Sequence, residues 1–165
     1  MDMPFFELEG RVKAVSWTGG SGLMSGQWSF SREGKLERGA WKVESRDLPG
    51  RIKSASYIEP GSDPREDTMV GHLEFSLDRN GAVRSVLNRN DFGEYGYEME
   101  RDIFSGRLSS LSLRDMADSL VYEFRYGNYV CDSLGNWTSR HFTVKCGGEA
   151  VNSGTESRII VYYDE

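Results

Sequence analysis

Three carboxylic acids in one stretch are spaced for catalysis. Glu98, Glu100 and Asp102 stand at every second position, so in a β-strand their side chains would share one face, about 7 Å apart. Inverting glycoside hydrolases use two carboxyls at roughly this spacing, one as acid and one as base. The same pattern also fits a solvated outer face opposite Tyr97 and Met99. A small hydrolase of sugar or peptide, with Glu98 or Glu100 as the acid, is therefore the alternative hypothesis rather than the leading one.

Other catalytic or metal-binding sets are weaker. Ser139 and His141 lie two residues apart, but strand neighbours at this spacing project in parallel, and no orienting acid stands nearby. His72 and His141 do not combine with Cys131 and Cys146 into a zinc-ligand spacing. The turn predicted between the two cysteines separates them along the strand, so we expect free thiols. The sequence predicts no catalytic residue, metal site or cofactor.

Arginine and aromatic residues gather late in the sequence. If the strand that begins at Trp137 pairs with the final strand, then Arg140, Arg158 and Tyr162 share one end of the sheet with it. Because interfaces use arginine and aromatic residues heavily, these four residues are predicted to bind a ligand or partner. The alternative is that the arginines stack on rings or pair with acids such as Asp132 and Glu156, and so hold the last hairpin to the final strand.

The expected hairpin register fixes where two of these side chains point. If Gly135 reverses the chain through a two-residue loop, Trp137 falls opposite Val130 and Arg140 falls on the other face, near Gly127. The apolar alternation changes parity at Gly127, which predicts a β-bulge there.

One turn unit recurs five times and organises the whole chain. It has the form D-x-x-G-x-Φ, where Φ is a large apolar residue, with one copy that starts at serine and one that is longer by a residue. The copies are Ser31–Leu36, Asp47–Ile52, Asp78–Val83, Asp102–Leu108 and Asp132–Trp137. The first side chain accepts backbone hydrogen bonds, and the glycine takes the positive φ of a tight turn. We therefore expect hairpin turns at Gly34, Gly50, Gly81, Gly106 and Gly135, with Asp78 and Asp132 among the turn-forming acids.

Alternating apolar residues between these turns predict about nine or ten strands and almost no helix. The fold class is all-β, an antiparallel meander that forms a curved sheet or a partly closed barrel. Strands are expected at 11–17, three within 27–58, further ones within 72–89 and 97–114, and at 120–131, 137–146 and 158–165. The expected connections are loops at 18–26, 59–71 and 146–157, a link at 90–96 and a short helical turn at 114–119.

Composition excludes several functional classes. The chain has 165 residues, which is one domain on the usual size prior. Its 26 acidic and 20 basic side chains are interleaved, so no basic stripe is present and nucleic acid is not an expected partner. No apolar run approaches the roughly 20 residues of a membrane-spanning helix. The first ten residues, MDMPFFELEG, lack the basic start and apolar core of a signal peptide.

The sequence YVCDSLGNWTSR at Tyr129–Arg140 and the ending ESRIIVYY at Glu156–Tyr163 resemble the tyrosine/aspartate (YD) repeat-like proteins of bacteria. LEGRVKAVSW at Leu8–Trp17 is similar to the usual opening strand of that group. The resemblance implies an antiparallel β meander, often exported or surface-attached, without a common catalytic activity. We therefore expect one YD-repeat-like β domain over residues 1–165. Its expected role is a non-enzymatic binding or scaffold module of the cell envelope, with a protein or glycan partner.

Overall fold

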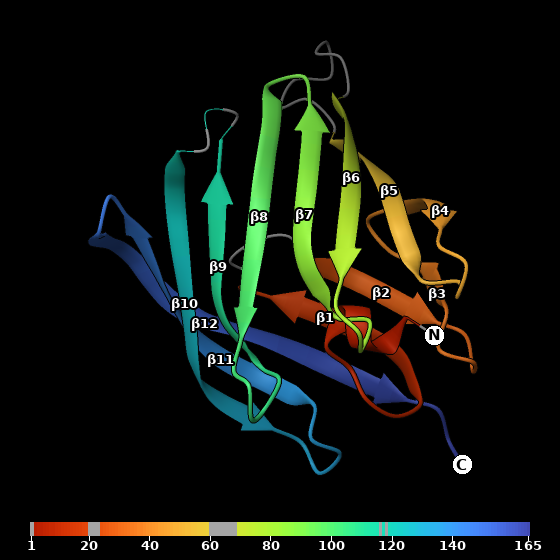
Figure 1. The fold of residues 1–165 in the computed structure, drawn as a ribbon. Coiled ribbons are helices and arrows are strands. Elements are labelled where there is room, and N and C mark those ends of the chain that lie inside the picture. Colours follow the sequence, from red (N-terminus) through yellow and green to blue (C-terminus); the bar gives the residue numbers. More distant parts are fainter. Residues whose placement is uncertain (1, 20–23, 60–68, 116, 118) are drawn as a thin grey trace.

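The computed structural model describes residues 2–19, 24–59, 69–115, 117 and 119–165. Over these residues the chain forms one antiparallel sheet of twelve strands and a short 3-10 helix, η1 (Met3–Phe6) (Figure 1). The strands are β1 (Val12–Thr18), β2 (Gly26–Phe30), β3 (Leu36–Arg38), β4 (Lys42–Arg46), β5 (Ile52–Glu59), β6 (Met69–Leu77), β7 (Val83–Asn90), β8 (Gly93–Arg101), β9 (Leu108–Arg114), β10 (Leu120–Cys131), β11 (Trp137–Cys146) and β12 (Glu149–Tyr162).

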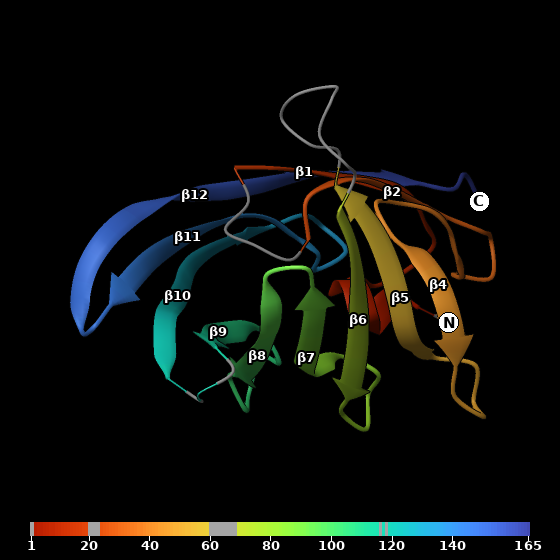
Figure 2. The same ribbon diagram turned by 90° about the horizontal axis from the view of Figure 1, so that it is seen from above.

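The first and the last strand of the chain pair with each other inside the sheet. Its strand order is β3-β2-β1-β12-β11-β10-β9-β8-β7-β6-β5-β4, so β1 pairs with β12 while β3 and β4 are the two edges. These edges are consecutive in the sequence and are joined only by residues 39–41, which span at most about 14 Å from Arg38 to Lys42. The sheet therefore curls until its edges approach each other, as Figure 2 shows, yet no ladder joins β3 to β4. The predicted all-β meander is confirmed as a curved sheet that does not close into a barrel.

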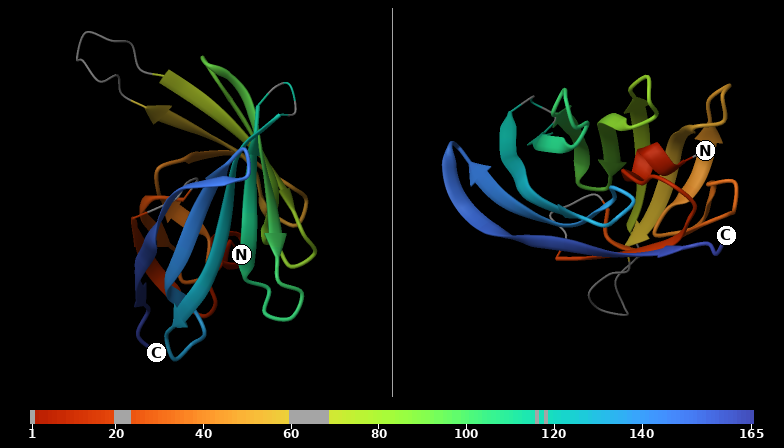
Figure 3. Two further views of the ribbon diagram at one scale, coloured as in Figure 1. Left: turned by 90° about the vertical axis from the view of Figure 1, so that its left-hand side faces the viewer. Right: turned by 90° about the horizontal axis from the view of Figure 1, so that it is seen from below.

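The five turn units lie at one end of this sheet. Strands β2, β4, β6, β8 and β10 all run toward that end, because neighbours in the sheet are antiparallel, and each is followed by one unit. We call this end the turn rim and the other end the opposite rim (Figures 1 and 3). In the last unit, Asp132 Oδ1 accepts hydrogen bonds from the backbone N–H groups of Leu134 and Asn136. The turn glycines with positive φ are Gly34, Gly50, Gly81, Gly106 and Gly135.

Several expected boundaries are wrong, and each has a local cause. The single strand expected near residues 35–45 is split into β3 and β4, because the chain leaves one edge of the sheet and enters the other at residues 39–41. The loop expected at 146–157 is mostly strand: only Gly147 and Gly148 turn, and β12 starts at Glu149. Residues 149–157 are mostly polar and show no alternation of apolar and polar side chains, so no strand was expected there. Their backbone nevertheless pairs with β11.

Two other expected connections also change. Strand β8 starts at Gly93, so most of the link expected at 90–96 belongs to a tight hairpin. The helical turn expected at 114–119 begins with Arg114, the last residue of β9. Residues 116 and 118 of that stretch, residues 20–23 of the first expected loop and residues 60–68 of the second lie outside the described residues.

The inside of the curl is filled by the chain's own first segment. Figure 3 shows η1 inside the curve of the sheet, near the turn rim. Phe6 is fully buried, and its ring centroid lies 5.1 Å from that of Trp28 and 5.0 Å from that of Phe30. Phe5 packs edge-on against Phe75 at 4.8 Å. The curled sheet has two arms, one that ends at the edge strand β3 and one that ends at the edge strand β4. Apolar side chains from both arms share a core with η1.

Candidate functional site

Ionic contacts hold residues 2–9 inside the sheet, and Asp2 makes the first of them. Its buried carboxylate accepts two hydrogen bonds from the guanidinium of Arg46 on β4, at 2.8 and 3.0 Å. It also accepts the backbone N–H of Leu36 on β3 at 2.8 Å. Because β3 and β4 are the two edges of the sheet, Asp2 joins edges that no ladder joins. The hydrogen bond that Arg46 donates to Asp2 is also the main reason that the pKa of Arg46 is raised.

Glu7 makes the second ionic contact, on the opposite side of η1. Its carboxylate accepts a hydrogen bond from Arg101 on β8 at 2.5 Å, and from Arg140 on β11 and the Trp137 indole at 3.3 Å each. Burial alone would raise the pKa of Glu7. Attraction by Arg140 and Arg101, with the hydrogen bond from Arg101, outweighs burial and lowers the pKa from 4.5 to about 2. Glu7 is therefore a stable internal anion at neutral pH.

Arg140 lies at the centre of this cluster and is only 4% exposed. Its Nε donates to Glu156 on β12 at 2.8 Å, and its guanidinium carbon lies 4.2 Å from the ring centroids of both Trp137 and Tyr126. Burial acts to lower the pKa of Arg140, but Glu7 and Glu156 outweigh it and raise the pKa. The side chain is thus both ion-paired and stacked.

Arg158 binds backbone carbonyls rather than a carboxylate. Its Nε donates to Trp137 O at 2.6 Å, and its two terminal nitrogens donate to Phe6 O at 3.0 Å and Glu7 O at 2.7 Å. These two carbonyls stand at the end of η1, where carbonyls lack partners within the helix. Burial lowers the pKa of Arg158 to about 10, so it remains protonated at neutral pH. Arg158 therefore attaches the end of η1 to the sheet.

The structure brings three of the four predicted binding residues together. Trp137, Arg140 and Arg158 meet in the interior, and each is 3–4% exposed. Tyr162 lies nearby but separately: its hydroxyl contacts Asp132 and accepts a hydrogen bond from Asn136, a residue that also holds the backbone of residue 9. Ligand binding by these residues stays a prediction, while the arrangement seen is that of ion pairs and ring stacking within the fold.

The register expected for the last hairpin is wrong. Trp137 lies opposite Cys131 rather than Val130, and Gly127 lies opposite His141. Arg140 points to the same side of the sheet as Trp137, because the ladder contains one extra β11 residue between Trp137 and Ser139, and this shifts the parity. The bulge expected at Gly127 is confirmed, since the register shifts directly after it and the next residue has a positive φ of 50°.

The ion pairs of Glu7 predict a pH dependence of stability. A carboxyl whose pKa is lowered by folding stabilises the protein above its ordinary pKa, and this contribution is lost as the pH falls through the lowered value. For Glu7 the window runs from pH 4.5 down to about 2. We expect the difference in free energy of unfolding between the unmodified protein and Glu7→Gln to be largest at neutral pH and to narrow across this window. Urea titrations from pH 7 to pH 2 measure it, and a constant difference would contradict the assignment.

Little space remains inside the sheet. A cavity of about 40 Å³ lies between η1 and the arginine cluster, lined by residues that include Phe6, Trp17, Arg140 and Glu156. This volume has room for a few water molecules at most. The buried Trp17 indole N–H has no hydrogen-bond partner among the described residues, so an internal water bonded to it is expected. The cavity is far smaller than the several hundred Å³ of an ordinary ligand pocket.

The acids singled out for catalysis are on the surface instead. Glu98 and Glu100 are exposed residues of β8, and Glu100 accepts only a long hydrogen bond, 3.4 Å, from the Ser110 hydroxyl. Asp102 lies beyond the end of β8, where it accepts the backbone N–H groups of Phe104 and Ser105 in its turn. Hydrogen bonds from Ser105 lower its pKa. Glu98, Glu100 and Asp102 therefore do not form a row of three carboxyls on one strand.

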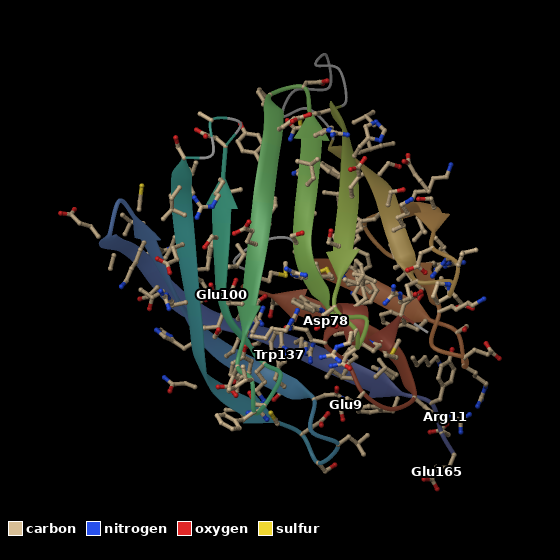
Figure 4. All side chains as sticks on the ribbon, in the orientation of Figure 1. Glu9, Arg11, Asp78, Glu100, Trp137 and Glu165 are labelled. Atoms are coloured by element: carbon tan, nitrogen blue, oxygen red, sulfur yellow. The ribbon has the colours of Figure 1, made fainter. Side chains whose placement is uncertain are left out.

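Glu98 lines an open groove on the outer face of β4–β8. The groove has a volume of about 780 Å³ and is lined by serine, charged and apolar side chains. Its polar lining includes Lys53, Glu74, Ser76, Ser85 and Glu98. Figure 4 shows the side chains around the sheet, with Glu100 and Trp137 labelled. The groove was missed in the sequence because its residues come from five strands that only the sheet register brings together.

The other motifs form no site in the part of the chain that the structure describes. Ser139 and His141 occupy neighbouring positions of β11 without an ion-paired acid, and Cys131 and Cys146 are free thiols. No three His, Cys, Asp or Glu side chains converge to hold a metal ion within the described ranges. No described helix is long and apolar enough to span a membrane.

Comparison with known proteins identifies no relative: no family model matches the chain, and a search of curated proteins gives no match either.

Proposed function

We propose that this protein is a non-enzymatic binding or structural module that uses the outside of its sheet. The observation that carries the proposal is the filled interior. Residues 2–8 occupy the inside of the curl and leave a cavity of only about 40 Å³. Enzymes and carriers that bind a small molecule inside the fold need an interior pocket of several hundred Å³. The surfaces left for a partner are the outer face and the two rims.

The outer groove of β4–β8 is the proposed contact surface. Its lining combines hydroxyl groups with charges of both signs, since Lys53 lies on β5, Glu74 on β6 and Glu98 on β8. Such a surface offers donors and acceptors to a polar partner, as a glycan or an extended peptide would need. These polar and charged groups surround Leu87 of β7, a combination that favours a glycan or an extended peptide over a large protein partner.

We further propose that the module belongs to the YD-repeat-like group and acts in the bacterial cell envelope. In support, the residues that carry the resemblance fall on turns and strands of the kind that such repeats would form. The D-x-x-G-N-W unit makes the hairpin between β10 and β11, and the ESRIIVYY ending lies almost entirely in β12. This part of the proposal rests on the resemblance.

A hydrolase remains the alternative, and one observation favours it. Glu98, the predicted acid, lines the groove together with Glu74, so a bound glycan or peptide would meet two carboxyls. Both side chains are exposed, whereas a general acid usually gains its raised pKa from burial. The binding role is therefore preferred.

Incubation with purified peptidoglycan sacculi separates the two roles. We expect the unmodified protein to co-sediment with the sacculi and to release no soluble sugar or peptide fragments, as detected by mass spectrometry. The double variant Ser76→Arg/Ser85→Arg, which fills the groove, should lower binding by about fivefold or more. Thr143→Arg, on the outer face of β11, is the matched control and should leave binding unchanged.

Two results would overturn the proposal. Soluble fragments that disappear in Glu98→Gln would show the groove to be catalytic. Absence of binding by the unmodified protein, or equal loss in the control, would remove the groove as a glycan-binding surface.

A further inference from the structure

Four large apolar side chains stand fully or largely in solvent at the tips of three turns. The exposed fractions are 105% for Leu48, 88% for Ile103, 92% for Phe104 and 52% for Leu134. They belong to the turns between β4 and β5, β8 and β9, and β10 and β11. Single exposed apolar residues are ordinary, but a repeated placement at turn tips calls for an explanation.

The topology gathers these tips at one end of the molecule. All three turns follow strands that run toward the turn rim, so their tips project from the same end of the sheet (Figures 1 and 3). Phe92, which is 79% exposed, sits between β7 and β8 and therefore at the opposite rim. Phe92 provides a natural comparison for the tip residues.

Hydrogen bonds at the base of each turn hold the tips outward. Asp102 accepts the backbone N–H of Phe104 at 3.0 Å, and Asp132 accepts that of Leu134 at 2.9 Å. In the first of the three turns, Asp47 binds both the backbone and the side chain of Arg51 at 2.8 Å. These turn acids are thus engaged by their own turns, and their hydrogen bonds fix the backbone that carries the exposed apolar residues.

The five turns themselves are electrically balanced although the chain is acidic. The five turns, residues 31–35, 47–51, 78–82, 102–107 and 132–136, contain five acidic and five basic side chains. The net charge of −6 lies in the rest of the chain, part of it at the same end of the sheet, where Glu9 and Glu165 flank Arg11 (Figure 4). Two of the rim arginines, Arg32 and Arg79, are exposed. The turns therefore add no net repulsion between this end and an anionic layer.

We propose that the turn rim binds a lipid surface. Leu48, Ile103, Phe104 and Leu134 insert at the boundary between headgroups and acyl chains, while Arg32 and Arg79 reach the phosphates. A protein partner would need a contiguous apolar centre, but these side chains stand on separate tips divided by charged turn bases. A fluid lipid layer fills the spaces between such tips. The surface is distinct from the outer groove, so the inference adds to the proposed function.

Flotation with lipid vesicles tests the proposal on the full chain. With large unilamellar vesicles of phosphatidylcholine and phosphatidylglycerol, the unmodified protein should float with the lipid. Leu48→Ser/Ile103→Ser/Phe104→Ser should lower the partition coefficient by about tenfold or more, because it removes most of the inserted apolar surface. Phe92→Ser should change partitioning by less than about twofold. All these side chains are exposed, so thermal unfolding should confirm that each variant folds like the unmodified protein.

Fluorescence locates the contact directly. Tryptophan in Phe104→Trp should shift its emission to shorter wavelength with vesicles and be quenched by brominated lipid, whereas Phe92→Trp should show neither effect. Three outcomes would overturn the proposal: an unmodified protein that stays in the aqueous fraction, an equal loss of partitioning in Phe92→Ser, or self-association in solution that the triple variant abolishes.

Discussion

Phe6→Ala should lower the free energy of unfolding by about 3–5 kcal/mol, the usual cost of truncating a fully buried phenylalanine. Phe6 has no exposed surface and packs between Trp28 and Phe30, which belong to one arm of the sheet. It also lies beside Trp41, at the start of the other arm, at 6.5 Å between ring centroids. The variant would leave a cavity between the two arms of the sheet, where Phe6 contacts rings from both.

Urea titration followed by tryptophan fluorescence measures this loss, because Trp28 and Trp41 report on the same core. The matched control is Phe92→Ala, which removes the same atoms from an exposed site and should change stability by less than about 0.5 kcal/mol. A loss below about 1 kcal/mol for Phe6→Ala would mean that the two arms pack stably without η1.

Glu7→Gln is expected to cost about 3 kcal/mol at neutral pH. The figure follows from the lowering of the Glu7 pKa from 4.5 to about 2, at 1.36 kcal/mol per unit. The carboxylate is only 15% exposed and is shared by Arg101 and Arg140, so the neutral amide would leave two buried guanidinium groups short of a counter-charge. Arg140 would keep Glu156, but Arg101 would keep only the carbonyl of Val83 as a partner.

Thermal and urea unfolding of Glu7→Gln should be compared with Glu37→Gln. Glu37 is an exposed residue of β3, and its neutralisation should change stability by less than about 0.5 kcal/mol. Equal stability of the two variants would show that the interior arginines do not depend on Glu7. The pKa of Glu7 measured by NMR titration would then be near its ordinary value.

The parts of the fold that sequence predicted well are those fixed by neighbours in the chain. Each turn depends on an acid or serine and a glycine three or four residues later, and all five occur where expected. In the first, Ser31 O accepts the N–H of Gly34, and in the last, Asp132 O accepts that of Gly135. The alternation of Leu73 and Phe75 likewise placed a buried face on β6, because a strand's two faces are set locally.

The parts that sequence missed depend on residues distant in the chain. Nothing near Glu7 indicates that its partners are Arg101 and Arg140, which are 94 and 133 residues away. One extra residue in the β10–β11 ladder then reversed the expected side of Arg140. The role of Asp2 was equally hidden, because the two sheet edges that it joins come together only after the curl has formed.

The pairing of β1 with β12 also means that the sheet cannot be completed until the last strand has been synthesised. Arg158 donates to Phe6 O across 152 residues, and Val12 pairs with Tyr162 in the ladder. At roughly 5–20 residues per second, residues 2–9 leave the ribosome on the order of 10 s before Arg158 is made. During that time Met3, Phe5 and Phe6 have no completed sheet to enter, and contacts between residues so far apart in sequence form slowly. Chaperones that bind short apolar segments would therefore meet this chain at η1, and refolding from urea should be slow compared with helical proteins of similar size.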